Sequence, residues 1–103
     1  MSQAQNELML VAIVPQALKD SVVDALMEQT SLSGFSLSKI QGFSQVHSHY
    51  NVAEQVSGYR DFYRFEITHE AQQSSPLIEL LALRSEAKSI RYWVLPIIES
   101  GVV

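Results

Sequence analysis

Cysteine is absent from the 103 residues of the chain. Disulfides, thiolate metal sites and cysteine nucleophiles are therefore all excluded. Charged residues are sparse too, at 17% of the chain, against about 25% in an average soluble protein. Seven Lys and Arg residues stand against eleven Asp and Glu residues, which gives a net charge of -4. Such a surface repels phosphate backbones, so we expect no nucleic-acid partner.

Long hydrophobic runs are also missing, because no run approaches the roughly 20 apolar residues of a membrane span. The first seven residues are polar and have no basic stretch before an apolar segment, so they do not form a secretory signal. We therefore expect a cytoplasmic protein without direct membrane insertion. The length predicts one domain over residues 1–103, and the hydrophobic fraction of 47% is enough for a buried core.

The hydrophobic pattern changes its period along the chain and predicts six elements. Residues 7–14 are a near-continuous apolar run that ends at Pro15, which is typical of a buried central strand. Residues 16–29 carry apolar side chains at helical spacing. The run Ser74-Ser75-Pro76 predicts the start of a second helix, with a serine cap followed by proline, and this helix ends near Ala87. The remaining strands are predicted over 35–46, 59–68 and 89–95.

The order β-α-β-β-α-β predicts a ferredoxin-like fold of the α+β class, with a four-stranded antiparallel sheet and two helices on one face. The other face is left uncovered, yet the later strands are apolar on both sides, with Phe62 beside Tyr63 and Trp93 beside Tyr92. A monomer would expose a sizeable apolar patch. Either other copies of the chain cover this face or a tail or loop does, and the pattern favours other copies.

Three stretches, taken in order, resemble the PII-like signal-transduction superfamily. They are Val14-Pro15, Gly34-Phe-Ser-Leu-Ser-Lys-Ile-Gln-Gly42-Phe-Ser-Gln45 and Tyr92-Trp-Val-Leu-Pro96. The resemblance covers nearly the whole chain and extends to the related CutA-like metal-tolerance proteins. It implies a ferredoxin-like homotrimer whose sheets pack around a central axis, with ligand clefts between subunits. It also implies that the loop after the second strand, here about 47–58, contacts a regulated protein, often a membrane transporter.

The same resemblance identifies candidate ligand-binding residues, which are Gly42, Phe43, Gln45 and Arg91. The alternative for the turn at Gly42 is a structural one, a bulge or a close approach of the backbone. The glycine-rich turn that holds ATP phosphates in PII proteins corresponds here to 88–91, which contains no glycine. The backbone of this stretch cannot approach phosphates as closely, so ATP binding is doubtful.

His47 and His49 are the candidate metal ligands. Side chains two residues apart on an extended strand point the same way, and neutral imidazole suits zinc, copper and nickel. The alternative is a solvated pair on a polar loop. A carboxylate could complete such a site, from Glu54, Asp61 or Glu66.

His69 lies beside Glu70 at a strand–helix junction, and we expect it at the surface rather than in a metal site.

No serine lies in a nucleophile-elbow context and no pair of carboxylates stands out, so we expect no enzyme. We predict a PII-like regulatory protein in signal transduction, resembling the nitrogen regulators. It would bind a small ligand, a divalent metal or copper at subunit clefts and control a partner protein such as a transport or efflux system. The alternative is a CutA-like heavy-metal tolerance protein that holds the metal as its main task.

Overall fold

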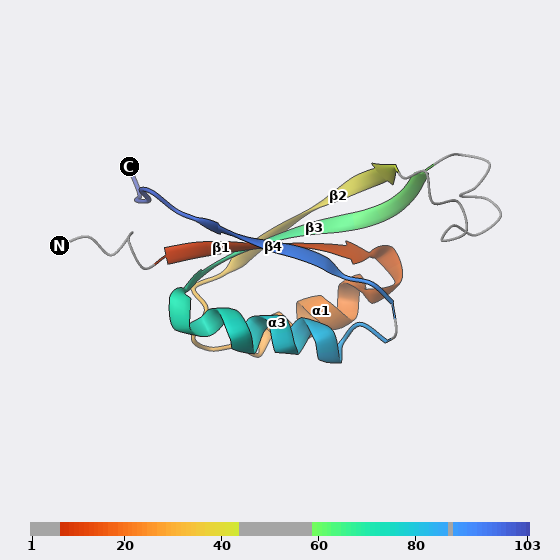
Figure 1. The fold of residues 1–103 in the computed structure, drawn as a ribbon, viewed down its shortest axis with the longest axis horizontal. Coiled ribbons are helices and arrows are strands. Elements are labelled where there is room, and N and C mark those ends of the chain that lie inside the picture. Colours follow the sequence, from red (N-terminus) through yellow and green to blue (C-terminus); the bar gives the residue numbers. More distant parts are fainter. Residues whose placement is uncertain (1–6, 44–58, 87) are drawn as a thin grey trace.

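The computed structural model describes residues 7–43, 59–86 and 88–103 (Figure 1). The predicted βαββαβ order is confirmed, with a short 3-10 helix before each α-helix. In chain order the elements are β1 (Glu7–Pro15), η2 (Gln16–Leu18), α1 (Lys19–Met27), β2 (Phe35–Phe43), β3 (Tyr59–Glu70), η4 (Ala71–Gln73), α3 (Ser74–Leu83) and β4 (Arg91–Pro96).

The four strands form one sheet in the order β2-β3-β1-β4, and every neighbouring pair is antiparallel. The first strand of the chain therefore lies inside the sheet, where Leu10 pairs with Ile67 on one side and Val94 on the other. Figure 1 shows both α-helices on the same face of the sheet. The predicted ferredoxin-like α+β fold is confirmed.

The core lies between the sheet and the two helices. Alternate residues of β1 point into it, and Leu10, Ala12 and Val14 are fully buried. Val11 and Ile13 point to the opposite face, where no helix lies, yet they are only 0% and 4% exposed. Strand β1 is therefore buried on both faces, which explains its near-continuous apolar sequence. The remaining buried members of the core are Leu18, Val22, Leu26, Phe65, Ile67, Leu77 and Leu81.

The start of α3 differs from the prediction, because neither Ser74 nor Ser75 caps the helix and both lie inside it. The cap is made one element earlier, where the Gln73 side chain accepts a hydrogen bond from the backbone N–H of Glu70 at 2.7 Å. The same side chain donates to the Ser31 hydroxyl at 3.0 Å and so ties the turn after α1 to η4. The Ser74 hydroxyl is used differently, in a contact with His69.

The predicted end of the second helix near Ala87 is wrong, because α3 ends at Leu83. The backbone N–H of Arg84 is shared between the carbonyls of Leu80 and Leu81, which tightens the last turn. Glu86 then adopts a left-handed backbone with a φ of 51°, which no helix can continue through. The last strand begins correspondingly later, at Arg91 rather than at residue 89.

The hairpin of β2 and β3 extends beyond the end of β1. Pro15 pairs with Phe62, so the first residues of β3 pair with β2 alone. Gly42 faces Arg60 in an unbroken register, and there is therefore no bulge at this glycine. A Cβ atom at Gly42 would lie 2.5 Å from a ring carbon of Phe62. Of the two structural alternatives, a bulge and a close approach, the second is therefore correct, and the ring of Phe62 is the group that lies close to Gly42. The predicted continuation of the strand to residue 46 lies outside the described residues.

Within the described ranges, no helix is both long enough and apolar enough to cross a membrane.

We predict that Gly42→Ala destabilises the protein, because the new methyl group displaces the Phe62 ring from a packed position. The expected loss in the free energy of unfolding is about 1–3 kcal/mol, the usual range for overpacking. Chemical denaturation measures it. Gly101→Ala is the matched control, since nothing lies within 4 Å of a Cβ atom there. In a Phe62→Ala background the penalty at Gly42 should disappear, and an equal penalty in both backgrounds would contradict the prediction.

Candidate functional site

Both α-helices lie on one face of the sheet and leave the other face uncovered, and this other face is called the open face below. The strand registers and the alternation of side chains place its members. They are Met9, Val11 and Ile13 of β1, Ser36, Ser38, Ile40 and Gly42 of β2, Phe62, Arg64, Glu66 and Thr68 of β3, and Arg91, Trp93 and Leu95 of β4.

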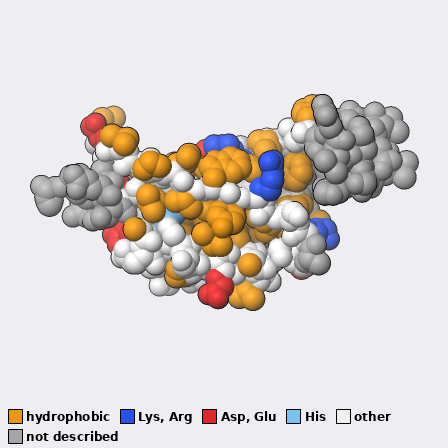
Figure 2. All heavy atoms as spheres, in the orientation of Figure 1, with side chains coloured by type: hydrophobic (Ala, Val, Ile, Leu, Met, Phe, Trp, Pro, Cys, Tyr) orange, Lys and Arg blue, Asp and Glu red, His pale blue; other side chains and the backbone are white. Residues whose placement is uncertain are grey.

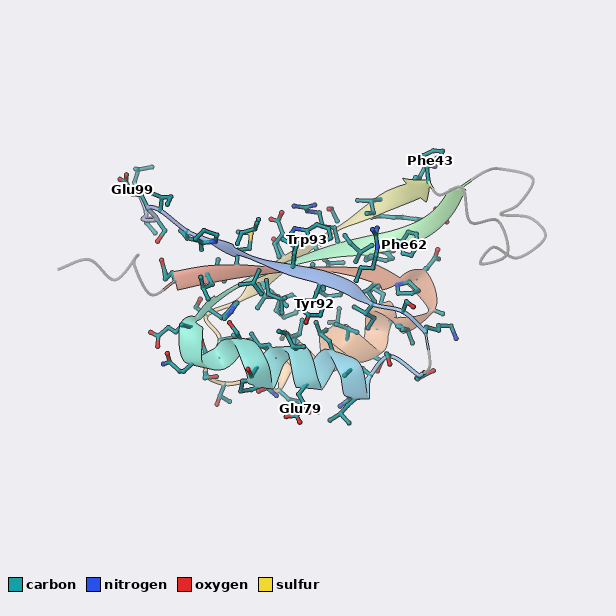
Figure 3. All side chains as sticks on the ribbon, in the orientation of Figure 1. Phe43, Phe62, Glu79, Tyr92, Trp93 and Glu99 are labelled. Atoms are coloured by element: carbon teal, nitrogen blue, oxygen red, sulfur yellow. The ribbon has the colours of Figure 1, made fainter. Side chains whose placement is uncertain are left out.

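The side of the open face nearest β4 is apolar. Trp93 stands opposite Val11 in the register and Leu95 opposite Met9. Trp93 is 37% exposed and Leu95 is 43% exposed, so both keep apolar surface in water. Figure 3 shows Trp93 on the side of β4 away from the helices and Tyr92 on the side toward them.

The open face lies between two rising ends of the molecule. In Figure 1 the hairpin of β2 and β3 rises at one end and the segment after β4 rises at the other, both away from the helices. The segment after β4 remains attached to β1, because the Ile97 N–H donates to the Glu7 carbonyl at 3.2 Å. The sheet is therefore twisted, so that β4 and the β2–β3 hairpin rise at opposite ends of the molecule in Figure 1.

The part of the open face nearest β2 is polar. Arg64 Nε donates to Glu66 Oε2 at 3.1 Å, and both side chains are a little over one third exposed. Ser36 and Ser38 stand beside them on β2, opposite Glu66 and Arg64 respectively. An ion pair at this exposure contributes little to the stability of one chain.

The predicted ligand-binding residues are not brought together within one chain. Gly42 and Phe43 end β2, which is one edge strand, and Arg91 begins β4, which is the other edge strand. By the alternation of β4, Arg91 lies on the open face with Trp93. Gln45 lies outside the described residues.

The predicted metal ligands His47 and His49, and the possible carboxylate ligand Glu54, also lie outside the described residues. The two other carboxylates considered are engaged elsewhere. Asp61 pairs with Lys39 at 3.9 Å, and Glu66 pairs with Arg64. In the part of the chain that the structure describes, no group of three His, Asp or Glu side chains could hold a metal ion.

The expectation that His69 lies at the surface is wrong, because the residue is only 4% exposed. Its Nδ1 lies 3.1 Å from the Ile67 carbonyl and its Nε2 lies 2.7 Å from the Ser74 hydroxyl. A carbonyl only accepts, so Nδ1–H donates to Ile67 and, in the neutral ring, the Ser74 O–H donates to Nε2. Both ring nitrogens are occupied, so His69 joins the end of β3 to the start of α3 and does not present a metal ligand.

A polar hollow of about 460 Å³ lies beside His69. Its walls come from the start of β1, the turn after α1 and the end of β3 with η4. The side chains around it already bond to one another, through Gln73 to Ser31 and through Gln72 to Glu70. This hollow is therefore a hydrogen-bonded junction between elements.

Lys19 at the start of α1 lies over the ring of Tyr63, with 5.2 Å between its Nζ atom and the ring centroid. Its ammonium group also contacts the Asp20 carboxylate at 2.9 Å. The hydrogen bond and the charge of Asp20 raise the pKa of Lys19, so this side chain stays protonated at physiological pH.

Comparison with solved structures places this geometry among known folds. A DUF3240 family protein from Shewanella baltica OS155 is 41% identical, with a TM-score of 0.80 over 100% of this chain and 99% of that one. Arabidopsis thaliana PII bound to citrate is 19% identical, with a TM-score of 0.68 over 90% of this chain and 78% of that one. The second likeness shows that the fold is PII-like.

No curated protein matches the chain at a significant level. A family model, described as "Protein of unknown function (DUF3240)", matches residues 4–103. The chain therefore belongs to the DUF3240 family, and it has a PII-like fold.

Proposed function

We propose that this chain is a cytoplasmic regulatory protein that forms a trimer, binds a small ligand or metal ion at clefts between subunits, and controls a partner protein. The observation that carries the proposal is the open face, a partly apolar sheet surface without helices in a PII-like fold. An exposed apolar sheet surface of this kind is typical of a site where another protein surface packs.

Assembly of the trimer would bury the open face. Trp93 is 37% exposed, and an aromatic side chain can bury up to about 250 Å². Covering the remainder removes about 90 Å² from water, which is worth about 2 kcal/mol at ~25 cal/mol per Å². Leu95 and the half-buried Phe62 add further area, so association gains several kcal/mol per subunit before its entropy cost.

The ligand would bind between subunits. Gly42 and Arg91 lie on opposite edge strands, so one chain cannot offer both to one ligand. Head-to-tail packing about a three-fold axis sets one edge of each subunit beside the other edge of its neighbour. In this arrangement Gly42 and Phe43 of one subunit meet Arg91 of the next. The crystal structure of the Arabidopsis protein holds citrate, which supports small-ligand binding on this fold.

By the resemblance, the segment 44–58 contacts a regulated protein, and a transport or efflux system is the proposed class. Catalysis is not part of the proposal. Ligand binding at the clefts would shift the population of partner-binding conformations, which requires different ligand affinities for the two states.

We predict that Trp93→Lys combined with Leu95→Lys converts the assembly to monomers, because two charges would have to be buried in the apolar part of the open face. Sedimentation equilibrium at micromolar concentration measures the change. Leu83→Lys is the control, since Leu83 is 80% exposed at the end of α3, on the helix side. It should leave the assembly intact. A wild-type chain that sediments as a monomer would overturn the assembly step.

We predict weak ATP binding, with a dissociation constant of roughly 0.1 mM or higher, equivalent to about -5.5 kcal/mol. The stretch 88–91 has no glycine to cradle phosphates, and the net charge of -4 gives no general attraction to a polyphosphate. Isothermal titration calorimetry measures the affinity. A low-micromolar constant for ATP or ADP would show that this stretch binds phosphates in another way.

The regulatory role is tested with the assembled protein as bait. We expect the wild type to recover a specific partner by crosslinking, and a variant with 44–58 replaced by a glycine-serine turn to lose it. Adding the small-molecule fraction of a cell extract should change the recovery. Equal recovery by both proteins under both conditions would contradict control through this segment.

A further inference from the structure

A hollow of about 240 Å³ lies between the second half of α3 and the start of β4. It is on the helix side of the sheet, so it is distinct from the open face. Figure 2 shows hydrophobic side chains gathered over β4 and toward α3. The walls are mostly apolar, from Ile78, Leu81, Ala82, Ile90 and Tyr92, and Ser85 and Lys88 add two polar side chains.

The turn that closes this hollow is held by hydrogen bonds. The Ser85 hydroxyl donates to the Ala82 carbonyl at 2.9 Å, and the Lys88 N–H donates to the Ser85 carbonyl at 2.8 Å. The left-handed backbone at Glu86 fixes the reversal of the chain. The hollow is therefore formed before any ligand arrives, which lowers the entropy cost of binding.

Lys88 supplies the charge at this hollow. The ion pairs of the described residues engage other cations, namely Lys19, Lys39 and Arg64. Among those residues no carboxylate lies within ion-pair distance of the Lys88 ammonium group. The Ser85 O–H already donates a hydrogen bond to the Ala82 carbonyl, so it is not available as a donor to a ligand. A ligand with an apolar body and one anionic group would thus match what the walls offer.

We propose that this hollow binds a small apolar monocarboxylate, with its body against Ile90 and Tyr92 and its carboxylate toward Lys88. An apolar cavity of about 150 Å³ holds one benzene molecule. A hollow of 240 Å³ therefore suits an acid about the size of benzoate. The inference names a ligand class for the proposed sensing role and rests on that role for its purpose. The hollow itself is complete within one chain.

The test uses benzoate as the probe, with benzyl alcohol as its neutral analogue. We expect millimolar or tighter binding of benzoate to the wild type, with NMR shifts in the methyl groups of Ile78 and Ile90. Benzyl alcohol should bind about tenfold more weakly, because it lacks the charge that Lys88 meets. Absence of saturable benzoate binding up to about 10 mM would overturn the proposal.

Two variants separate the apolar wall from the charge. Ala82→Leu fills the hollow from α3 and should abolish benzoate binding, while Ala17→Leu, at an exposed position of η2, should not. Lys88→Gln should bind both probes with equal affinity, while Lys39→Gln keeps the tenfold preference. Unchanged benzoate binding by Ala82→Leu, or an unchanged preference in Lys88→Gln, would place the ligand elsewhere and refute the proposal.

Sedimentation of the same samples distinguishes the two failures. If the protein is a monomer and binds benzoate with the expected pattern among the variants, the benzoate site is supported and the trimeric regulator is contradicted. If the protein is a trimer and does not bind benzoate, the proposed assembly is supported and the benzoate site is contradicted.

Discussion

The helices of this protein cover only one face of its sheet, and the rest of the structure depends on that constraint. Strand β1 pairs on both sides, so its outward residues Val11 and Ile13 must be buried without a helix above them. The long side chains around them provide the cover. Trp93 and Glu66 flank Val11, and they stay partly exposed in doing so. In a single chain, β1 is thus buried by side chains of the open face that themselves stay partly exposed to water.

The elements of the fold could be predicted from the sequence because each has its own hydrophobic period. The apolar run of β1, the helical spacing of α1 and the alternation in β3 each determine one element. The predicted helix boundaries were wrong where a local hydrogen bond or a local backbone conformation decided them. Ser74 has the sequence signature of a cap, but its hydroxyl is bonded to the buried His69. The chain cannot continue as a helix through Glu86, whose backbone is left-handed. Glycine is the residue that usually marks such a conformation in a sequence, and glutamate does not.

The sites were harder to predict than the elements, since they join residues that the sequence separates. Gly42 drew attention as a glycine in a strand, and the structure explains it through the ring of Phe62. In the sequence, Lys88 belongs only to a stretch that lacks the glycines of a phosphate-binding turn. Its position at an apolar hollow depends on Ile78 and Tyr92, which come from a helix and a strand. No short sequence motif indicates that these residues lie together, so the hollow is evident only in the three-dimensional structure.

The order of the strands has a consequence for synthesis. The chain makes its central strand first, and both neighbours of β1 come from the second half of the sequence. The most apolar segment therefore leaves the ribosome long before its hydrogen-bonding partners exist. Its pairing with β4, the last strand, must close a loop over most of the chain, which slows folding and prolongs exposure of sticky intermediates. One edge of β1 therefore stays without its partner strand until Pro96 has left the ribosome.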